Sequence, residues 1–137
     1  MRTLALLFAL VALGCTSSYE VFEIPYSYLD QPEYERVEVR FRNTFRYDVC
    51  LVPEFWPNKA GAIDQARGLV FLVIDGKRFS IRNINTGYCP GCFIRVAPGE
   101  EVVAYIPYTD FDLPKELYSL KKTLVFSPKG ERCSGRR

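Results

Sequence analysis

The sequence predicts an all-β protein built as an antiparallel sandwich of about seven strands. Short runs rich in β-branched and aromatic residues recur at spacings of roughly ten residues along the chain. Turn signals separate these runs, most clearly at Asp75-Gly76 and at Pro98-Gly99. In several of the runs apolar and polar side chains alternate, which is the pattern of a strand with one buried face.

The first predicted strands precede a long connection. In 35–42, valine and phenylalanine side chains alternate with glutamate and arginine, so we expect a half-buried strand. A second, β-branched strand is expected at 46–52, and Pro53 ends it because proline cannot donate a hydrogen bond to the ladder. The remaining predicted strands are 69–75, 78–83, 93–96, 102–108 and 122–128.

The later elements each have their own signal. The run 69–75 is apolar on both faces, which predicts a strand at the centre of a sheet. The Asp-Gly pair that ends it supplies the positive φ angles of a hairpin turn, so the next strand should return beside it. Short helical turns are predicted at 62–67 and at 112–120, where Asp112 would cap the N-terminus.

The number and spacing of the strands resemble an immunoglobulin-like sandwich. The signature of antibody domains is absent, because Trp56 follows Cys50 by only six residues. The resemblance therefore extends to the architecture and not to the antibody family. A transthyretin-like sandwich or a small β-barrel is the alternative arrangement.

Residues 1–14 are predicted to be a signal peptide. A short positive stretch precedes the apolar run 4–13, which is too short to cross a bilayer, since a crossing helix needs roughly 20 residues. The sequence "ALGC" at 12–15 then resembles the lipobox of bacterial lipoproteins. The resemblance implies cleavage before Cys15, diacylation of its sulfur and acylation of its new amine. The alternative is an ordinary secreted protein in which this cysteine has no such role.

The same resemblance implies a location. Lipoproteins of Gram-negative bacteria that are kept at the inner membrane usually carry aspartate after the lipidated cysteine, and this chain has Thr16. It therefore resembles the outer-membrane class. We expect a protein of the cell envelope, held by lipid at Cys15 to the outer membrane and facing the periplasm.

The domain organisation follows from these signals. Residues 15–34 are the lipid anchor and an aromatic-rich segment that should pack along the domain, with an aromatic ligand-binding strip as the alternative. The β-sandwich domain is predicted at 35–133, and 134–137 is a basic tail. Without Arg2 the chain has 17 basic and 16 acidic side chains, a balance that argues against a nucleic-acid partner and against a polybasic membrane-binding surface.

Four cysteines remain once Cys15 is set aside. In an oxidising compartment an even number predicts two disulfides. Cys89 and Cys92 are close enough to pair locally, and Cys50 with Cys133 would then join the two ends of the domain. The two other pairings of these four cysteines stay open.

The residues available for catalysis are few. The chain has no histidine, which excludes Ser-His-Asp and Cys-His catalysis. Ser119 and Lys122 match a Ser-x-x-Lys pattern, but the other elements of the penicillin-binding enzymes are absent. Asp110 and Asp112 could hold calcium or act as acid and base, although Asp112 is better explained as a cap. We therefore predict no enzyme, no cofactor and no metal site.

The stretch "TGYCPGCF" at 86–93 carries the remaining chemistry. Cys89 and Cys92 could form a structural disulfide loop, a redox pair or half of a zinc site. No helix is predicted after Cys92, and the chain lacks the helices of a thioredoxin fold, so we favour the structural loop. Pro90 and Gly91 support it, because proline followed by glycine forms the centre of a type II turn.

A stapled loop would also be a rigid binding loop. Tyr88 and Phe93 flank the cysteines, and a preorganised aromatic loop loses less entropy on binding. The simpler interpretation, which the sequence favours, places Phe93 in the core and Tyr88 over the edge of a sheet.

These observations predict a non-enzymatic envelope lipoprotein, a binding or structural module that acts on a protein or another envelope component. The alternative is an inhibitor or immunity protein that blocks a periplasmic hydrolase or toxin with the loop around Tyr88 and Phe93. A third hypothesis is a thiol–disulfide oxidoreductase that uses Cys89 and Cys92.

Overall fold

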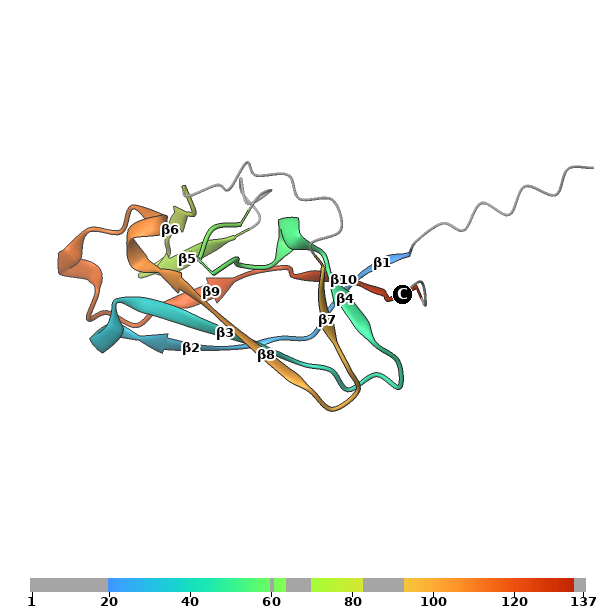
Figure 1. Ribbon diagram of the computed structural model, residues 1–137. Helices are drawn as coiled ribbons and strands as arrows, with labels where there is room; N and C mark the ends of the chain where they lie inside the picture. Colours follow the sequence, from blue (N-terminus) through green and yellow to red (C-terminus); the bar gives the residue numbers. More distant parts are fainter. Residues whose placement is uncertain (1–19, 60, 64–69, 83–92, 135–137) are drawn as a thin grey trace, which may run out of the picture.

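The computed structural model describes residues 20–59, 61–63, 70–82 and 93–134, and this part of the chain is all-β (Figure 1). Every strand pair is antiparallel, and the described residues contain no α-helix. The strands are β1 (Val21–Glu23), β2 (Ser27–Gln31), β3 (Arg36–Arg42), β4 (Val49–Leu51), β5 (Phe71–Ile74), β6 (Lys77–Ser80), β7 (Ile94–Val96), β8 (Glu101–Pro107), β9 (Thr123–Val125) and β10 (Lys129–Arg132). The 3₁₀ turns are η1 (Pro32–Tyr34), η2 (Pro53–Phe55), η3 (Tyr108–Phe111) and η4 (Lys115–Leu117).

The strands form three small sheets, in the orders β1-β10-β4-β7, β2-β3-β8 and β6-β5-β9. None of the three is closed into a barrel, so the small-barrel alternative has no support in the described residues. In Figure 1 the sheet β2-β3-β8 lies below the sheet β6-β5-β9, and β1, β4, β7 and β10 gather at the end where the N-terminal trace leaves. The prediction of an antiparallel all-β protein is confirmed.

One buried apolar cluster receives side chains from all three sheets. On β3 the alternation predicted from the sequence is present in part, because Val37, Val39 and Phe41 are fully buried and Arg40 and Arg42 are exposed. Glu38, predicted on the polar face, is buried as well. Side chains from the other sheets complete the cluster, among them Val49, Leu51, Leu72, Ile74, Ile106 and Leu124.

Two predictions about the β5–β6 hairpin are confirmed. β5 lies at the centre of its sheet, with β6 on one side and β9 on the other. Asp75 and Gly76 have φ angles of 46° and 76°, the positive values that a two-residue turn of this kind requires.

The aromatic-rich N-terminal segment packs along the domain, as expected, over residues 20–34. β1 pairs with β10, and β2 pairs with β3. Phe22 and Tyr26 pack against the core, whereas Tyr28 and Tyr34 are exposed. The aromatic rings therefore do not line up as one ligand-binding strip.

The helical turn near residue 115 is present as η4, but the prediction for Asp112 is wrong. Asp112 ends the preceding turn η3, where it adopts a left-handed conformation with φ of 51°. Pro114 occupies the N-cap of η4. The carboxylate of Asp112 pairs instead with Arg82, at 2.6 Å between Nη1 and Oδ2. Of the turn predicted at 62–67, residues 64–67 lie outside the described residues.

Cys50 and Cys133 form the disulfide expected from the sequence. Cys50 lies on β4 and Cys133 directly follows β10, and these strands are neighbours in one sheet. The bond joins two positions separated by 83 residues and leaves no partner role for Cys50 in the rival pairings. Cys89 and Cys92 lie outside the described residues, so their pairing stays a prediction.

Candidate functional site

The predicted binding loop is described only at its last residue. Tyr88, Pro90 and Gly91 lie outside the described residues, together with Cys15 and the cysteines of the loop. Phe93 is described, and its side chain is 41% exposed just before β7. The interpretation that placed Phe93 in the core is therefore wrong.

Exposed apolar side chains continue from Phe93 onto two edge strands. Among the described residues, β7 ends the sheet β1-β10-β4-β7 and β8 ends the sheet β2-β3-β8. Ile94 on β7 is exposed, as are Val103 and Tyr105 on β8. Because Ala104 between them faces the core, Val103 and Tyr105 must both lie on the outer face of the sheet.

A groove of about 300 Å³ lies between these strands. β7 and β8 leave the turn at 97–100 and diverge, and the segment after η2 closes the space between them (Figure 1). Ile94 and the buried Trp56 contribute to its apolar lining, and Lys59 is the exposed cation on its rim. The other lining residues are Pro57, Asn58, Val102, Val103, Ala104 and Tyr105.

An arginine stacks between two tyrosines beside the groove. The Arg36 guanidinium carbon lies 3.8 Å from the ring centre of Tyr105 and 4.9 Å from that of Tyr34. Arg36 Nε also donates a hydrogen bond of 2.7 Å to Gln31 Oε1, which fixes the plane of the guanidinium. Both tyrosines keep large exposed surfaces, 62% for Tyr34 and 40% for Tyr105. The stack is thus both ordered and accessible.

A row of polar contacts holds this stack from below. Gln31 Nε2 donates to Glu38 Oε2 at 3.1 Å, and Arg40 pairs with the other oxygen of the same carboxylate. Arg40 also lies 3.6 Å from Glu101 on β8. The hydrogen bond and the charge of Glu38 raise the pKa of Arg40. Three neighbouring strands are cross-linked in this way across their outer face.

We call the apolar and stacked side chains on this outer surface the Tyr105 face; the exposed, ion-paired Arg40 and Glu101 lie beside it on the same side of the sheet. It consists of Leu29, Tyr34, Arg36, Val103 and Tyr105, and it adjoins the groove through Val103 and Tyr105. Strand register places these residues together, since Leu29 and Tyr105 are both paired with Glu38, on opposite sides of it. Tyrosine and arginine are enriched at protein–protein interfaces, and lysine and glutamate are depleted.

The Tyr105 face was not predicted from the sequence. Its signal was present in part, because a strand predicted at 102–108 with inward Ala104 requires outward Val103 and Tyr105. The contribution of Tyr34 and Arg36 depends on the pairing of β3 with β8, which joins positions far apart in the chain. No local pattern reports such a pairing.

A buried ionic cluster lies behind β2. Lys122 is 3% exposed, and its Nζ donates to the carbonyls of Tyr118 and Leu120 and pairs with Asp30 at 3.4 Å. The hydroxyl of the fully buried Tyr108 also donates to Asp30. Burial, and then the hydrogen bond to Asp30, raises the pKa of Tyr108 far above its usual value. The Lys122 amine is committed to these contacts and is not accessible to a substrate.

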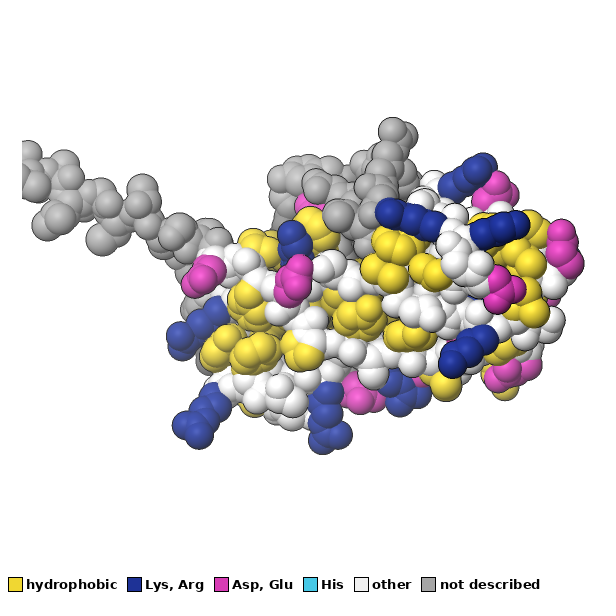
Figure 2. All heavy atoms as spheres, turned by 180° about the vertical axis from the view of Figure 1, so that it is seen from behind, with side chains coloured by type: hydrophobic (Ala, Val, Ile, Leu, Met, Phe, Trp, Pro, Cys, Tyr) yellow, Lys and Arg dark blue, Asp and Glu magenta, His cyan; other side chains and the backbone are white. Residues whose placement is uncertain are grey.

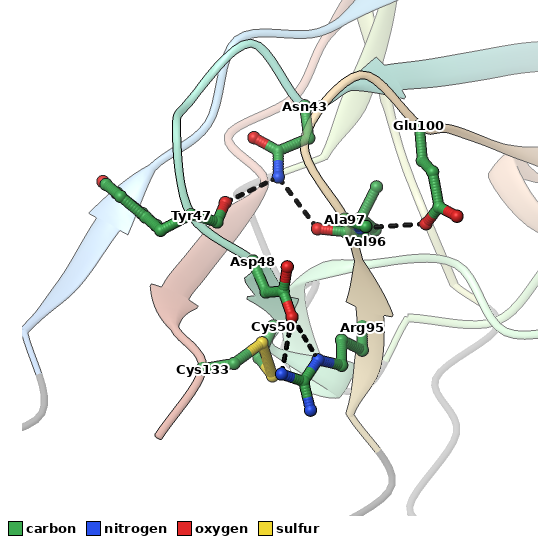
Figure 3. A network of polar contacts seen from close by, with 9 residues as sticks. All are labelled: Asn43, Tyr47, Asp48, Cys50, Arg95, Val96, Ala97, Glu100 and Cys133. Carbon is green, nitrogen blue, oxygen red and sulfur yellow. Dashed lines mark hydrogen bonds and ion pairs between the residues drawn. A yellow bond between two sulfur atoms is a disulfide. The ribbon is translucent and has the colours of Figure 1, made fainter. Parts of the chain in front are cut away.

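A second ordered region lies around Asn43, whose side chain is fully buried (Figure 3). Its Nδ2 donates to the carbonyls of Tyr47 at 2.9 Å and Val96 at 2.8 Å, and its Oδ1 accepts from the backbone N–H of Phe45. The backbone carbonyl of Asn43 accepts from Gly99 at 2.8 Å. The Asn43 side chain therefore fixes loop 43–48 and ties it to β7, while its backbone carbonyl ties the loop to the turn before β8.

The disulfide borders the same region. Figure 3 shows Asp48 and Arg95 beside the bond between Cys50 and Cys133. Arg95 Nη2 lies 2.5 Å from Asp48 Oδ2, and the N–H of Cys133 donates to the carbonyl of Asp48 at 3.0 Å. Loop 43–48 is thereby held at both of its ends.

Other possible sites are few. Asp110 is buried in η3 while Asp112 is exposed, so the two carboxylates lie in different surroundings. Within the described ranges, no three His, Cys, Asp or Glu side chains gather as a metal site would need. The described part of the chain also has no helix that is long and apolar enough to cross a membrane.

Comparison of the chain with models of known families, with curated proteins and with solved structures found no match. The function is therefore argued from the surfaces of this chain.

Proposed function

We propose that the protein is a non-enzymatic binding module of the cell envelope, anchored through Cys15 to the outer membrane and facing the periplasm. It recognises a protein partner with its Tyr105 face and the adjoining groove. The observation that carries the proposal is the exposed stack of Tyr34, Arg36 and Tyr105. It combines the residue types that dominate binding energy at protein interfaces with a fixed geometry.

Preorganisation strengthens the argument. A flexible arginine loses rotamer freedom when it enters an interface, at a cost of roughly 0.5–1.5 kcal/mol. Arg36 has already lost part of that freedom, because two rings and Gln31 hold it in the unbound protein. The groove beside it could receive one apolar side chain of the partner, in the manner of an interface anchor.

The envelope location has its own support. The Cys50–Cys133 disulfide is of the kind that persists in oxidising compartments. The signal-like segment and Cys15 supply the route and the anchor. An immunoglobulin-like sandwich is the arrangement we propose for the three sheets, supported by the single core that they share.

An inhibitor or immunity protein is the second candidate, and the exposure of Phe93 favours it. Phe93 lies at the C-terminal end of the predicted loop and just before Ile94 in the wall of the groove. An inhibitor that inserts this loop into a partner would depend on Phe93. A binding module that uses the Tyr105 face would depend on Arg36 instead.

Site-specific photo-crosslinking tests the proposal. A photoreactive amino acid replaces Val103 on the Tyr105 face or, as the control, the exposed Lys121. In cells that produce the full chain, we expect a discrete protein adduct from position 103 and none from position 121. Equal adducts from both positions, or none from position 103, would contradict a binding role for this face. Loss of the adduct on Phe93→Ala but not on Arg36→Ala would favour the inhibitor.

A further inference from the structure

We propose that the end of the molecule formed by β1 and loop 43–48 rests on the membrane surface and holds the domain upright on it. The occupant of this surface is the lipid bilayer itself. The inference rests on the proposed lipid anchor at Cys15, but it concerns a different set of residues and a different contact.

The length of the tether limits where the domain can lie. Only residues 16–19 separate Cys15 from Glu20, the first described residue, and β1 begins at Val21. Because an extended chain spans at most about 3.6 Å per residue, Glu20 can lie no more than roughly 18 Å from the anchored cysteine. The end that carries β1 must therefore stay at the membrane surface.

Three aromatic rings at this end pack against the core with part of their surface and leave the rest exposed. The ring centres of Phe22 and Phe45 are 5.5 Å apart, and those of Phe45 and Tyr47 are 5.3 Å apart. The guanidinium of Arg132 lies 5.0 Å from the ring centre of Tyr47. Arg46, which lies between Phe45 and Tyr47 in the sequence, is exposed. Aromatic and arginine side chains favour the headgroup region of a bilayer. Their apolar part can contact the acyl chains while their polar end stays in water.

The loop does not need to reorganise in order to bind. The side chain of Asn43 bonds to Phe45, Tyr47 and Val96, and the Asp48–Arg95 ion pair holds the other end (Figure 3). The aromatic side chains are thus presented by a fixed backbone, which lowers the entropy lost on contact.

The overall shape gives this contact a consequence. Figure 2 shows apolar, basic and acidic side chains at the end of the molecule where the N-terminal trace leaves, and Figure 1 shows η1 at the opposite end. β3 runs between the two ends over seven residues, which is about 20 Å at the usual rise of a strand. If loop 43–48 contacts the membrane surface, Tyr34 and Tyr105 lie on the side of the domain that faces away from the membrane.

Fluorescence quenching by lipid tests the contact. An environment-sensitive fluorescent amino acid replaces the exposed Thr44 in the loop or, as the control, the exposed Glu33 in η1. The acylated mature chain is inserted into vesicles of phosphatidylethanolamine and phosphatidylglycerol that contain brominated acyl chains. We expect the fluorescence at position 44 to be lost and that at position 33 to be retained. Equal fluorescence at the two positions in vesicle-bound protein would overturn the proposal.

Two further arms separate this contact from the anchor. In the first, a histidine tag in place of Cys15 holds the mature chain to vesicles with nickel-chelating lipids, and the same quenching at position 44 is expected. Quenching in this arm would support the membrane contact whatever the chemistry of the tether, whereas a mature chain that carries no acyl groups in cells would refute the anchor alone. In the second arm, Phe45→Ser with Tyr47→Ser should restore the fluorescence at position 44, whereas Tyr28→Ser should not. Urea unfolding of each variant confirms that it is folded.

Discussion

Asn43 shows how one buried polar side chain can organise a surface. It is fully buried, yet its amide makes three hydrogen bonds to the backbone, two as donor and one as acceptor. A buried amide with fewer partners would destabilise the fold, because its desolvation would not be offset. Here the amide donates to one carbonyl of loop 43–48 and one of β7 and accepts from the backbone N–H of Phe45. The shape of the loop therefore depends on this one residue.

Asn43→Ala should lower the free energy of unfolding by roughly 2–4 kcal/mol, because it removes three hydrogen bonds and leaves buried backbone groups without partners. Urea denaturation measures the change. The matched control is Thr44→Ala, an exposed neighbour in the same loop, which should change stability by no more than about 0.5 kcal/mol. Similar losses for both variants would show that Asn43 does not organise the loop.

Among the elements, the shape of the groove depends on how closely the segment after η2, which contains Gly61, packs against β8. Gly61 has a φ angle of +82°, and a Cβ there would lie 2.5 Å from Pro107 Cδ and 2.9 Å from the carbonyl oxygen of Tyr105. The absence of a side chain thus allows the chain after Trp56 to approach β8 and to close the groove. A left-handed backbone and a close approach are required at the same position.

Gly61→Ala should therefore be more destabilising than a positive φ angle alone explains. Gly99 supplies the control, since it has the same φ of +82° and nothing within 4 Å of its missing Cβ. We expect Gly99→Ala to cost about 1 kcal/mol of unfolding free energy from backbone strain, and Gly61→Ala to cost clearly more because of the steric clash. Equal losses in thermal or urea unfolding would show that the segment does not pack on β8 as described.

The elements that the sequence predicted have strong local signals. β3 follows from its alternation, and the β5–β6 hairpin from its Asp-Gly turn. β1 and β10 were missed because they are short and pair with strands far away in the chain, as with Val21 opposite Glu131. β2 pairs with the next strand, β3, and was missed because Ser27–Gln31 contains no β-branched residue. Asp112 was misassigned because an aspartate suits either a cap or a left-handed turn, and the tertiary contact with Arg82 accompanies the second.

In the whole molecule, the disulfide joins two strands of one sheet that lie far apart in the sequence. Cys50 and Cys133 link β4 to the end of β10, beside the loop proposed to meet the membrane. The cysteine count and the short spacing between Cys89 and Cys92 favoured this pair, although the sequence left the two other pairings open. The Tyr105 face could not be predicted, since it is assembled from β2, η1, β3 and β8 and exists only once β3 pairs with β8.

Replacing both Cys50 and Cys133 with serine should lower the free energy of unfolding by about 4 kcal/mol in the chain-entropy model, because the bond closes a loop of 83 residues. Urea unfolding with and without a reducing agent measures the effect. In the parent protein the reductant should cause a similar loss, while the double variant should show little further change. A parent protein whose stability does not respond to full reduction would contradict a stabilising role for this bond.

The claim that the Tyr105 face binds a protein partner is tested most directly by asking whether the photo-crosslink at position 103 depends on Arg36. Arg36→Ala removes the centre of the Tyr34–Arg36–Tyr105 stack. Arg78→Ala is the matched control, because it removes an arginine that lies over the ring of Phe71, at 3.6 Å from the ring centre, in another sheet. We predict that Arg36→Ala reduces the adduct about tenfold, as the loss of an interface anchor does, and that Arg78→Ala leaves it unchanged. An adduct that survives Arg36→Ala, or that falls equally in both variants, would contradict the claim that this face binds the partner.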